Sequence, residues 1–435
     1  MSDYKMLHPN MGPYKRSVSI IGTGCTPFQN MLANPDWSGI TENELFACAA
    51  IDAMDDAGIE GKDVDAFIQS QLFTGLTRQM NGNVFCADWI GMRGKASWHI
   101  ESACTSSALV FDSAVMAVAS GRYDVVLAGG VDMAYSVPDG KKPSCYRRPT
   151  TSEEMSDALL RWADPAYARY IGAGHMYVTE DIAEPYMEKY RVTPEELDDA
   201  FIGLAISSRR GAALEPNALF QTEYKDLAKA AGYDDVIKYM KSFHNPKITN
   251  YHRKSGFYST TDGAAAVIVC ATDILDKLKV KGKPIEVLGI GFSTFDHRHP
   301  QVVSRCNDEA ARQVFELTGV KPEEIDIMLT PDFSAEEVLD AAEAAGYLPK
   351  GEGWKYLRDQ RTAYDGDKPI NTDGGCASFG HVFGASTLSK LHEAVHQMRG
   401  ECGARQVRKL PKTALVRGQG GAQSALMAIL RTLEK

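Results

Sequence analysis

The stretch Trp98-His-Ile-Glu-Ser-Ala-Cys-Thr-Ser-Ser-Ala-Leu-Val-Phe111 decides the fold, because it leads from a strand into a helix through a run of small residues. It places Cys104 at the junction, and an amphipathic helix is expected from Ser106 to Ser120. Gly121 ends that helix, and the apolar run Asp124-Val-Val-Leu-Ala-Gly-Gly130 indicates a buried strand. The order of strand, cysteine, helix and strand is typical of an α/β protein.

The position of Cys104 has a chemical consequence. A thiol just ahead of a helix lies near unpaired backbone N–H groups, and the helix dipole favours its thiolate. The small neighbours leave room for a carbonyl group, and backbone N–H groups can face a developing oxyanion. A buried cysteine is also commonly an inert, small hydrophobic side chain. The stretch alone therefore leaves a nucleophilic and a structural interpretation open.

A second informative segment, Asn371-Thr-Asp-Gly-Gly-Cys-Ala-Ser-Phe-Gly-His-Val-Phe-Gly-Ala-Ser386, places His381 in a glycine-rich loop before another expected helix. Further on, Ala414-Leu-Val-Arg-Gly-Gln-Gly-Gly-Ala-Gln423 predicts a short apolar strand that ends in a glycine turn. Backbone N–H groups of Gly420 and Gly421 in that turn are candidates for an oxyanion site. A cysteine, a histidine and a glycine turn together favour the nucleophilic interpretation.

These segments resemble the thiolase superfamily. The loop with His381 is similar to the family's motif of an asparagine, a glycine pair and Gly-His-Pro-x-Gly, with Val382 in place of the proline. The segment Thr261-Asp-Gly-Ala-Ala-Ala-Val267 is similar to a strand-entry segment of the family, and the matches extend over residues 17 to 433. The resemblance implies a duplicated α/β thiolase fold with five layers, α-β-α-β-α.

The chain also repeats itself. The helices expected from Glu42 to Ala57 and from Asn307 to Thr318 each follow an apolar strand, and each ends at a glycine. Strands that alternate with helices predict right-handed βαβ units around mostly parallel sheets. We therefore expect an N-terminal half at residues 1–275 and a C-terminal half at residues 276–435, with the active site where the halves meet.

An insertion from about residue 135 to residue 254 interrupts the N-terminal half. Thr193-Pro-Glu-Glu-Leu predicts a helix start inside it, with a threonine cap and proline in the first turn. The stretch from Ala205 to Asn217 resembles the thiolase loop domain that covers coenzyme A, which implies that Arg209 and Arg210 pair with the phosphates of this substrate. A solvated helix face is an equally good interpretation of the two arginines.

The sequence departs from the family at the position of a second cysteine. Most thiolases carry that cysteine in the final glycine turn, and Val416-Arg-Gly-Gln-Gly-Gly421 has none. Leu329-Thr-Pro-Asp-Phe-Ser-Ala335 resembles the His-Asp-x-Phe segment of the sterol-carrier-type and archaeal branch, with Asp332 at the variable position. A carboxyl group in a water-poor cleft can exchange protons, so Asp332 is a candidate acid/base group. Alternatively, Asp332 caps the helix expected from Ser334.

Two other side chains near these motifs have competing interpretations. His99 precedes Cys104 by five residues and is a possible polar contact, although a structural role on the strand is favoured. Cys376 lies in the same loop as His381 and is a possible proton carrier, although a buried structural thiol is favoured.

The composition excludes several classes of protein. A formal net charge of −10 argues against sequence-independent binding to nucleic acid. The chain lacks the run of ~20 apolar residues that a membrane span requires, and its start has no apolar signal core, so we expect a cytoplasmic protein. The nine cysteines include no C-x-x-C pair, which indicates reduced thiols and no metal site in this chain.

The resemblance implies an acyl-CoA C-acyltransferase that cleaves a 3-oxoacyl-CoA with coenzyme A through an acyl group on Cys104. It also implies a homodimer core and, from the branch, a small partner subunit with an OB fold and a zinc ribbon that holds any zinc. Two alternatives remain: a thiolase-like aldolase or acyltransferase to another acceptor, and a non-catalytic scaffold. The aldolase branch commonly has a tyrosine in the segment that corresponds to residues 329–335, and none occurs here.

Overall fold

The computed structural model describes residues 16–72, 80–142, 146–151, 153–154, 175–294, 305–420 and 424–433. The helices that the sequence predicts are confirmed, with α1 at Glu42–Ala57, α4 at Ser106–Ala119 and α11 at Arg305–Thr318. Helix α1 begins at a capping box between Thr41 and Glu44 and ends at Gly58, whose φ of 74° is in the left-handed region. Local sequence therefore fixes both ends of this helix.

Nine of the described strands form one sheet in the order β3-β2-β4-β7-β1-β8-β11-β10-β9. Their bounds are β1 Val18–Cys25, β2 Ala66–Ser70, β3 Ala96–Ile100, β4 Val125–Met133, β7 Asp262–Ala271, β8 Ile285–Thr294, β9 Ile327–Leu329, β10 Thr413–Gly420 and β11 Ser424–Thr432. The expected parallel pairing holds for β2–β3, β2–β4 and β9–β10. The remaining pairings of this sheet are antiparallel, because β10 turns directly into β11 and because the insertion returns β7 between β4 and β1.

The order of strands repeats about the junction of β1 and β8, which pair antiparallel through Val18–Val287 and Ile20–Ile285. On one side lie β1, β7, β4 and β2, and on the other lie β8, β11, β10 and β9 in the equivalent order. A parallel bridge from Met328 to Ile370 extends the second side in the way that β3 extends the first. The topology is thus duplicated, while the boundary at residues 275 and 276 stays a prediction.

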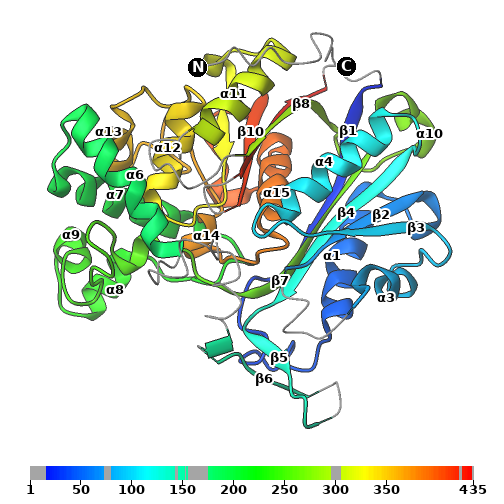
Figure 1. Cartoon of the computed structure of the whole chain (residues 1–435), viewed down its shortest axis with the longest axis horizontal. Helices are drawn as coiled ribbons and strands as arrows, with labels where there is room; N and C mark the ends of the chain where they lie inside the picture. The colour runs from blue at the N-terminus through cyan, green and yellow to red at the C-terminus, as the bar shows by residue number, and fades with distance from the viewer. Residues whose placement is uncertain are drawn as a thin grey trace.

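Helices form the layers around these strands (Figure 1). Helix α4 and helix α15 (Ser386–Arg399) pack against each other and lie between strands of both halves. Helix α1 covers the outer face of β1, β4 and β7, and helix α11 covers the outer face of β8 and β11. One hydrophobic core surrounds α4 and α15 between the halves, and two further cores lie under α1 and α11. These layers confirm the five-layered α-β-α-β-α arrangement.

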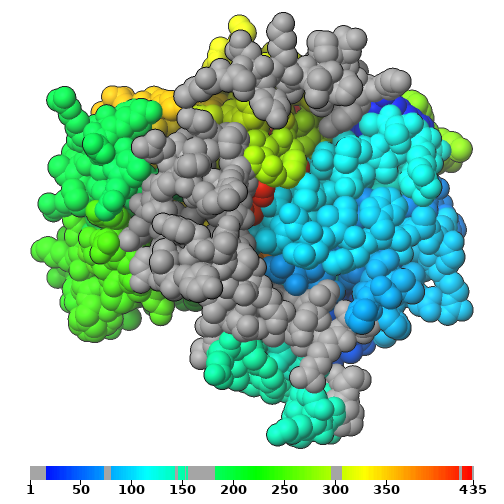
Figure 2. All heavy atoms as spheres, in the orientation of Figure 1, coloured from blue at the N-terminus to red at the C-terminus, as the bar shows by residue number. Residues whose placement is uncertain are grey.

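The insertion contains β5 (Ser136–Pro138), β6 (Arg147–Pro149), α6 (His175–Tyr190), α7 (Pro194–Ala212), α8 (Tyr224–Ala230) and α9 (Val236–Met240). Thr193 caps α7 with a capping box to Glu196, as the sequence predicts. Helices α7 to α9 form a green lobe on the left in Figures 1 and 2, while α3 (Gly82–Trp89) lies at the opposite side of the view. The lobe packs on α13 (Gly353–Arg358) and α14 (Gly375–Ser378), so it adjoins the loop that holds His381.

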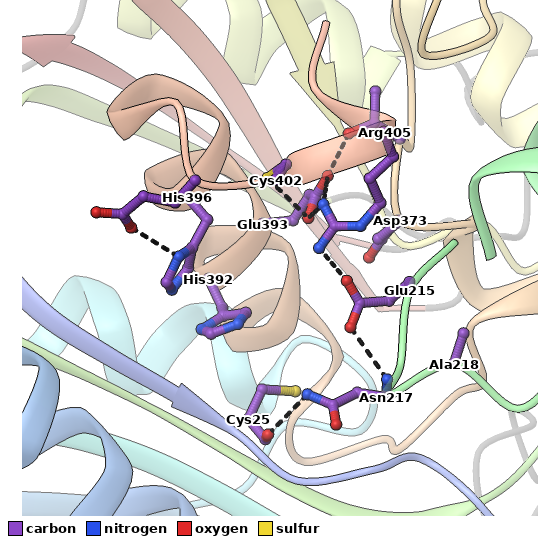
Figure 3. Close-up of polar contacts among 12 residues, drawn as sticks. Cys25, Glu215, Asn217, Ala218, Asp373, His392, Glu393, His396, Cys402 and Arg405 are labelled. Carbon is purple, nitrogen blue, oxygen red and sulfur yellow. Dashed lines mark hydrogen bonds and ion pairs between the residues drawn. The ribbon is translucent and has the colours of Figure 1, made fainter. Parts of the chain in front are cut away.

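A buried ionic network fixes the chain that leaves α7 (Figure 3). Arg405 forms ion pairs with Glu393 of α15, at 2.8 Å, and with Glu215 of the insertion. Glu215 also accepts a hydrogen bond from the backbone N–H of Asn217, whose side-chain amide donates to the Cys25 carbonyl at 3.1 Å. Loss of one partner would leave a buried charge without a counter-charge, which is strongly destabilising. The network therefore holds the insertion against both halves.

The described part of the chain has no helix that is long and apolar enough to cross a membrane. It also holds no group of three or more His, Cys, Asp or Glu side chains that is arranged to bind a metal ion. None of the described cysteines forms a disulfide bond; Cys145 lies outside the described residues.

Candidate active site

Cys104 lies in a tight turn two residues before α4. Ala103 has a φ of 47°, a conformation that residues other than glycine rarely adopt. The Ser106 hydroxyl holds the turn, since it accepts from the Ser102 N–H at 2.7 Å and donates to the Ala103 carbonyl at 2.5 Å. A backbone conformation fixed in this way next to a reactive residue is common at functional sites.

The environment of Cys104 differs from the expectation of a stabilised thiolate. Burial raises the pKa of the Cys104 thiol well above its ordinary value, and the charges of Glu337, Cys376 and Asp132 raise it further. The end of helix α4 therefore does not outweigh the cost of moving a thiolate out of water. A reaction at this sulfur requires a base that removes its proton.

His381 lies in the seam between the halves and is fully buried. Its backbone N–H donates to the Ser259 carbonyl at 2.7 Å, and its carbonyl accepts from the Thr261 N–H at 3.0 Å. The ring is held at Nδ1, which lies 2.7 Å from the hydroxyl oxygen of Ser386. That hydroxyl is also 2.9 Å from the Val382 carbonyl, to which it donates, so Nδ1–H donates to Ser386 and Nε2 is the acceptor in the neutral ring.

Cys104 and His381 share one set of aromatic neighbours. The His381 ring contacts the rings of Tyr258, Phe333 and Phe383 at centroid distances of 5.0, 4.8 and 4.5 Å. Cys104 packs in a hydrophobic cluster with Phe333 and Phe383, and Tyr258 packs against that cluster. The structure thus brings together the two residues that the sequence singled out in different halves.

Asp132, at the end of β4, links the loops of the two halves. Its Oδ2 accepts from the Gly384 N–H at 2.6 Å, and its Oδ1 accepts from the Leu72 N–H at 2.9 Å. The approach is so close that a Cβ on Gly130 would lie 1.8 Å from the Gly384 carbonyl oxygen. Asp132 was not among the residues predicted from the sequence, although an acidic residue at the end of a buried strand is a recognisable signal.

Asp332 is buried, but it does not cap the helix that follows it. Helix α12 (Ala335–Ala344) has Ser334 at its N-cap, so the predicted alternative for Asp332 is wrong. Instead, Asp332 accepts hydrogen bonds from the Cys376 N–H and from the Asn371 side chain, the latter at 3.2 Å. Burial raises the pKa of Asp332 to about 7. The carboxyl group therefore holds the loop of His381 and titrates near neutral pH.

The final glycine turn adjoins the residue after Cys104. Gly420 ends β10, and a Cβ at this position would lie 2.0 Å from Thr105 Oγ1. The Thr105 hydroxyl is 2.5 Å from the Ser424 hydroxyl at the start of β11. Gly421, the second predicted backbone donor, lies outside the described residues. Gly420 is therefore close enough to the Cys104 turn to take the predicted part in an oxyanion site.

A cavity extends from the insertion to the Tyr258 ring beside His381. Arg209 lines it, with Nη2 3.0 Å from the Tyr224 hydroxyl and the guanidinium 4.0 Å from the Phe220 ring centroid. Burial lowers the pKa of Arg209. The other lining residues are Leu227, Tyr239, His244, Asn245, Ile248, Lys254, Ser255, Phe257, Ser259, Thr260 and Ala377.

Arg210 and the two minor candidates have other surroundings. Arg210 forms an ion pair with Asp365 at 2.7 Å and is not among the residues that line the cavity. His99, on the outermost strand β3, has Nε2 3.2 Å from the Gln71 carbonyl. Cys376 is buried, and burial raises the pKa of its thiol. The structure therefore separates the two predicted arginines.

Comparison with known proteins identifies the family. The profile of the thiolase N-terminal domain matches residues 18–273, and the profile described as thiolase C-terminal domain-like matches residues 293–432. The chain therefore belongs to the thiolase family, a family of acyltransferase enzymes.

Individual relatives match over nearly their whole length. The acetyl-CoA acetyltransferase of Methanothermobacter thermautotrophicus is 28% identical, over 93% of this chain and 97% of its own. The benzoylsuccinyl-CoA thiolase subunit BbsB of Thauera aromatica is 27% identical, over 94% and 95%. Among solved structures, the Ltp2-ChsH2(DUF35) aldolase has a TM-score of 0.70 at 20% identity, over 96% of this chain and 98% of that one. Human mitochondrial 3-ketoacyl-CoA thiolase in complex with CoA has a TM-score of 0.65 at 16% identity, over 97% and 100%.

Proposed function

We propose that the protein is a thiolase-type C-acyltransferase, which cleaves a 3-oxoacyl-CoA with coenzyme A through an acyl group on Cys104. One observation carries this proposal: Cys104 and His381 come from different halves and share aromatic neighbours, one of which, Tyr258, also lines the cavity. A nucleophile, a fixed imidazole and an entry path are the parts that covalent acyl transfer requires.

In the proposed reaction, Nε2 of His381 takes the thiol proton of Cys104, and the thiolate attacks the keto carbon. The resulting imidazolium donates Nε2–H to the oxyanion, together with backbone N–H groups of the Gly420 and Gly421 turn. The carbon–carbon bond then breaks, which leaves the acyl group on Cys104 and an enolate of the CoA ester. Protonation releases that ester, and the thiol of coenzyme A takes the acyl group.

The enolate requires an acid, and the sequence offers Asp332 for this role. Its support is a pKa that burial raises to about 7, which suits a group that gives and takes a proton near neutral pH. Against it stands the observation that its Oδ1 already accepts hydrogen bonds from Cys376 and Asn371.

Coenzyme A is proposed to occupy the cavity as a substrate, with its phosphates at Arg209. This arginine is 6% exposed and is placed by Tyr224, Ser378 and Phe220, without an acidic partner among its described contacts. A guanidinium with unused donors at a cavity wall suits a phosphate. Arg210 was predicted to share this role, and its ion pair with Asp365 leaves it fewer donors.

We propose a 3-oxoacyl-CoA of the benzoylsuccinyl-CoA type as the substrate. The support is the BbsB relative, whose name states that acyl group. Cleavage of such a substrate would yield benzoyl-CoA and succinyl-CoA, and would place the enzyme in anaerobic toluene degradation in the cytoplasm. The M. thermautotrophicus relative, named for acetyl transfer at a similar identity, supports acetoacetyl-CoA as the competing substrate.

Two kinds of partner are proposed. The outermost strand β3 lies beside α3, whose Val84, Phe85 and Trp89 are each more than half exposed, so a second copy could cover this edge and form a homodimer. A small subunit with an OB fold and a zinc ribbon is the second partner. Its support is the similar Ltp2-ChsH2(DUF35) structure.

An aldolase is the second candidate function, and one observation favours it. Tyr258 packs against His381 and Phe333, so a tyrosine is present in the site although none occurs in residues 329–335. Burial raises the pKa of Tyr258, which makes it a poor base, and an aldol cleavage has no use for the nucleophile Cys104. A non-catalytic scaffold would need neither Cys104 nor His381.

A product assay separates these functions. The purified chain, alone and with its co-purifying small subunit, is incubated with benzoylsuccinyl-CoA or acetoacetyl-CoA, with and without coenzyme A. We expect two CoA thioesters, only when coenzyme A is present and Cys104 is intact. Cleavage of a 3-hydroxyacyl-CoA without coenzyme A would establish the aldolase, and inactivity of every combination would favour the scaffold.

A further inference from the structure

Helix α12 carries three buried acidic side chains, Glu336, Glu337 and Glu343, and a half-buried fourth, Asp340; all but Glu337 have the direct polar partners described next. Glu336 bonds to His252 and accepts from the Ser334 hydroxyl. Asp340 accepts from the Asn307 side chain at 2.6 Å, and Glu343 accepts from the Tyr186 hydroxyl at 2.7 Å. Such contacts offset the cost of burying a carboxyl group.

Glu337 differs from these three. It is 2% exposed, and its Oε2 has no hydrogen-bond partner among the described residues. Arg417 and Gln419 on β10 act on the pKa of Glu337 and lower it, and the described residues show no ion pair between Glu337 and Arg417. A buried carboxyl oxygen without a partner is costly, and native proteins retain such groups mainly where they function.

The charges around Glu337 indicate its protonation state. Arg417 is fully buried. Its Nε lies 2.8 Å from the side-chain oxygen of Asn307, and its Nη1 lies 3.1 Å from the Thr330 hydroxyl. The charges of two acids, buried Glu337 and half-buried Asp340, act on this one guanidinium. Burial raises the pKa of Asp340 to about 6 and that of Glu337 to about 8. At neutral pH Asp340 balances the charge of Arg417, and Glu337 keeps its proton.

Among the acids, Glu337 also has the largest effect on the pKa of the Cys104 thiol. Apart from burial, its charge is the largest cause that raises the pKa of Cys104. The geometry agrees, since Glu337 and Ser424 line one small cavity and Ser424 lies 2.5 Å from the hydroxyl of Thr105, the residue after Cys104. Glu337 and the residue after Cys104 thus both adjoin Ser424 at the start of β11.

We propose that Glu337 is the acid/base group that replaces the missing second cysteine, by carrying the proton of the carbon nucleophile. When the carbon–carbon bond breaks, the Glu337 carboxyl donates its proton to the α-carbon of the leaving CoA ester and becomes a carboxylate. The carboxylate then takes the thiol proton of coenzyme A, whose sulfur attacks the acyl group on Cys104, and the carboxyl is restored.

This inference rests on the proposed function, and it replaces Asp332 in the proton step. Asp332 already accepts hydrogen bonds from the Cys376 N–H and the Asn371 side chain, whereas Oε2 of Glu337 has no hydrogen-bond partner among the described residues. The remaining titratable groups that face Glu337 are Glu336 and Asp340 on its own helix, Arg417 on β10 and Cys104 before α4.

The test follows the proton at carbon separately from acyl transfer. The wild-type chain, with its co-purifying partner, is incubated in D2O with acetyl-CoA or succinyl-CoA, and deuterium at the α-carbon is measured by mass spectrometry. Acylation of Cys104 is measured on the intact protein in parallel samples with p-nitrophenyl acetate, because its leaving group departs without a proton from Glu337. The variants are Glu337→Gln, the shorter acid Glu337→Asp and, as a matched control, Glu343→Gln from the same helix.

We expect Glu337→Gln to acylate Cys104 while its deuterium exchange falls at least ~10²-fold, the usual contribution of a general acid/base group. Glu337→Asp should recover part of the exchange, and Glu343→Gln should match the wild type. Exchange in Glu337→Gln within about threefold of the wild type would overturn the proposal, as would loss of acylation together with exchange. A wild type that never acylates Cys104 would instead refute the proposed function, and the inference would fall with it.

Discussion

Equivalent loops in the two halves have taken different parts of the chemistry. The loop before α4 follows strand β3, and the loop before α15 follows Ile370, which bridges to β9 in the equivalent place. Both contain a residue in the left-handed region, Ala103 with a φ of 47° and Asn371 with a φ of 50°. Each half thus places one reactive residue in such a loop, Cys104 directly after Ala103 and His381 further along the longer loop after Asn371.

The two loops differ in what holds them. Groups close in the sequence hold the turn around Cys104, namely the Ser106 hydroxyl and the Glu101 carboxylate, which accepts from the Ala103 N–H at 2.8 Å. The longer loop with His381 depends on groups from elsewhere, namely Asp332 at Cys376, Asp132 at Gly384 and Lys390 of α15 at Asp373. We therefore expect substitutions at Cys104 to change chemistry alone, and substitutions around His381 to change chemistry and loop position together.

The largest effect is expected for Cys104→Ala, because the proposed reaction forms its acyl intermediate on the Cys104 sulfur. Turnover of a 3-oxoacyl-CoA should fall ~10³-fold or more, as is usual when a covalent nucleophile is lost. Steady-state thioester formation measures the loss, and thermal unfolding serves as the control, with a transition close to that of the wild type. Wild-type turnover in the Cys104→Ala variant would show that Cys104 is not the nucleophile.

The next effect concerns His381. Loss of one oxyanion donor commonly lowers turnover ~10²–10³-fold, so His381→Ala should fall in that range. His381→Asn keeps a side-chain N–H donor and should retain part of the activity. If both variants turned over like the wild type, the second loop would have a structural role only.

A smaller effect is expected for Asp332→Asn. The Asn side-chain oxygen can still accept from the Cys376 N–H, so the loop should keep its position and turnover should fall less than ~10-fold. The same rate and deuterium-exchange measurements compare it with Glu337→Gln. A loss as large as that of Glu337→Gln would return the proton step to Asp332.

The smallest effect separates the neighbouring arginines. Arg209→Met removes a donor from the cavity wall and should raise the KM for coenzyme A about tenfold, the usual worth of a charge-assisted hydrogen bond. Arg210→Met breaks only the partly exposed ion pair with Asp365 and should leave this KM within about twofold. Equal effects of the two substitutions would contradict the location of the substrate phosphates.

The sequence predicted the features that depend on local pattern. The ends of α1 and the start of α7 follow from capping residues and glycine, and the duplication follows from the repeated order of elements. Cys104 and His381 were found because small residues surround them in characteristic motifs. Each of these signals lies within a few residues of the feature that it predicts.

The remaining features depend on packing between distant segments. Asp332 was expected to cap the adjacent helix, but its partner, Cys376, lies 44 residues away. Glu337 belongs to a helix whose acids suggest a solvated face, and only its burial near Arg417 and Gln419 reveals a different environment. Arg209 and Arg210 are neighbours in the sequence, yet adjacent helix positions point in directions about 100° apart, so one lines the cavity and the other does not.

The most direct test of the account is mass spectrometry of the wild-type chain, quenched with acid during turnover of a 3-oxoacyl-CoA and digested to peptides. We expect a mass increase equal to one acyl group on the peptide that contains Cys104. Added coenzyme A should remove this group, and His381→Ala should form it more slowly. An acyl group on a different cysteine, or turnover without any acyl-enzyme, would contradict the account.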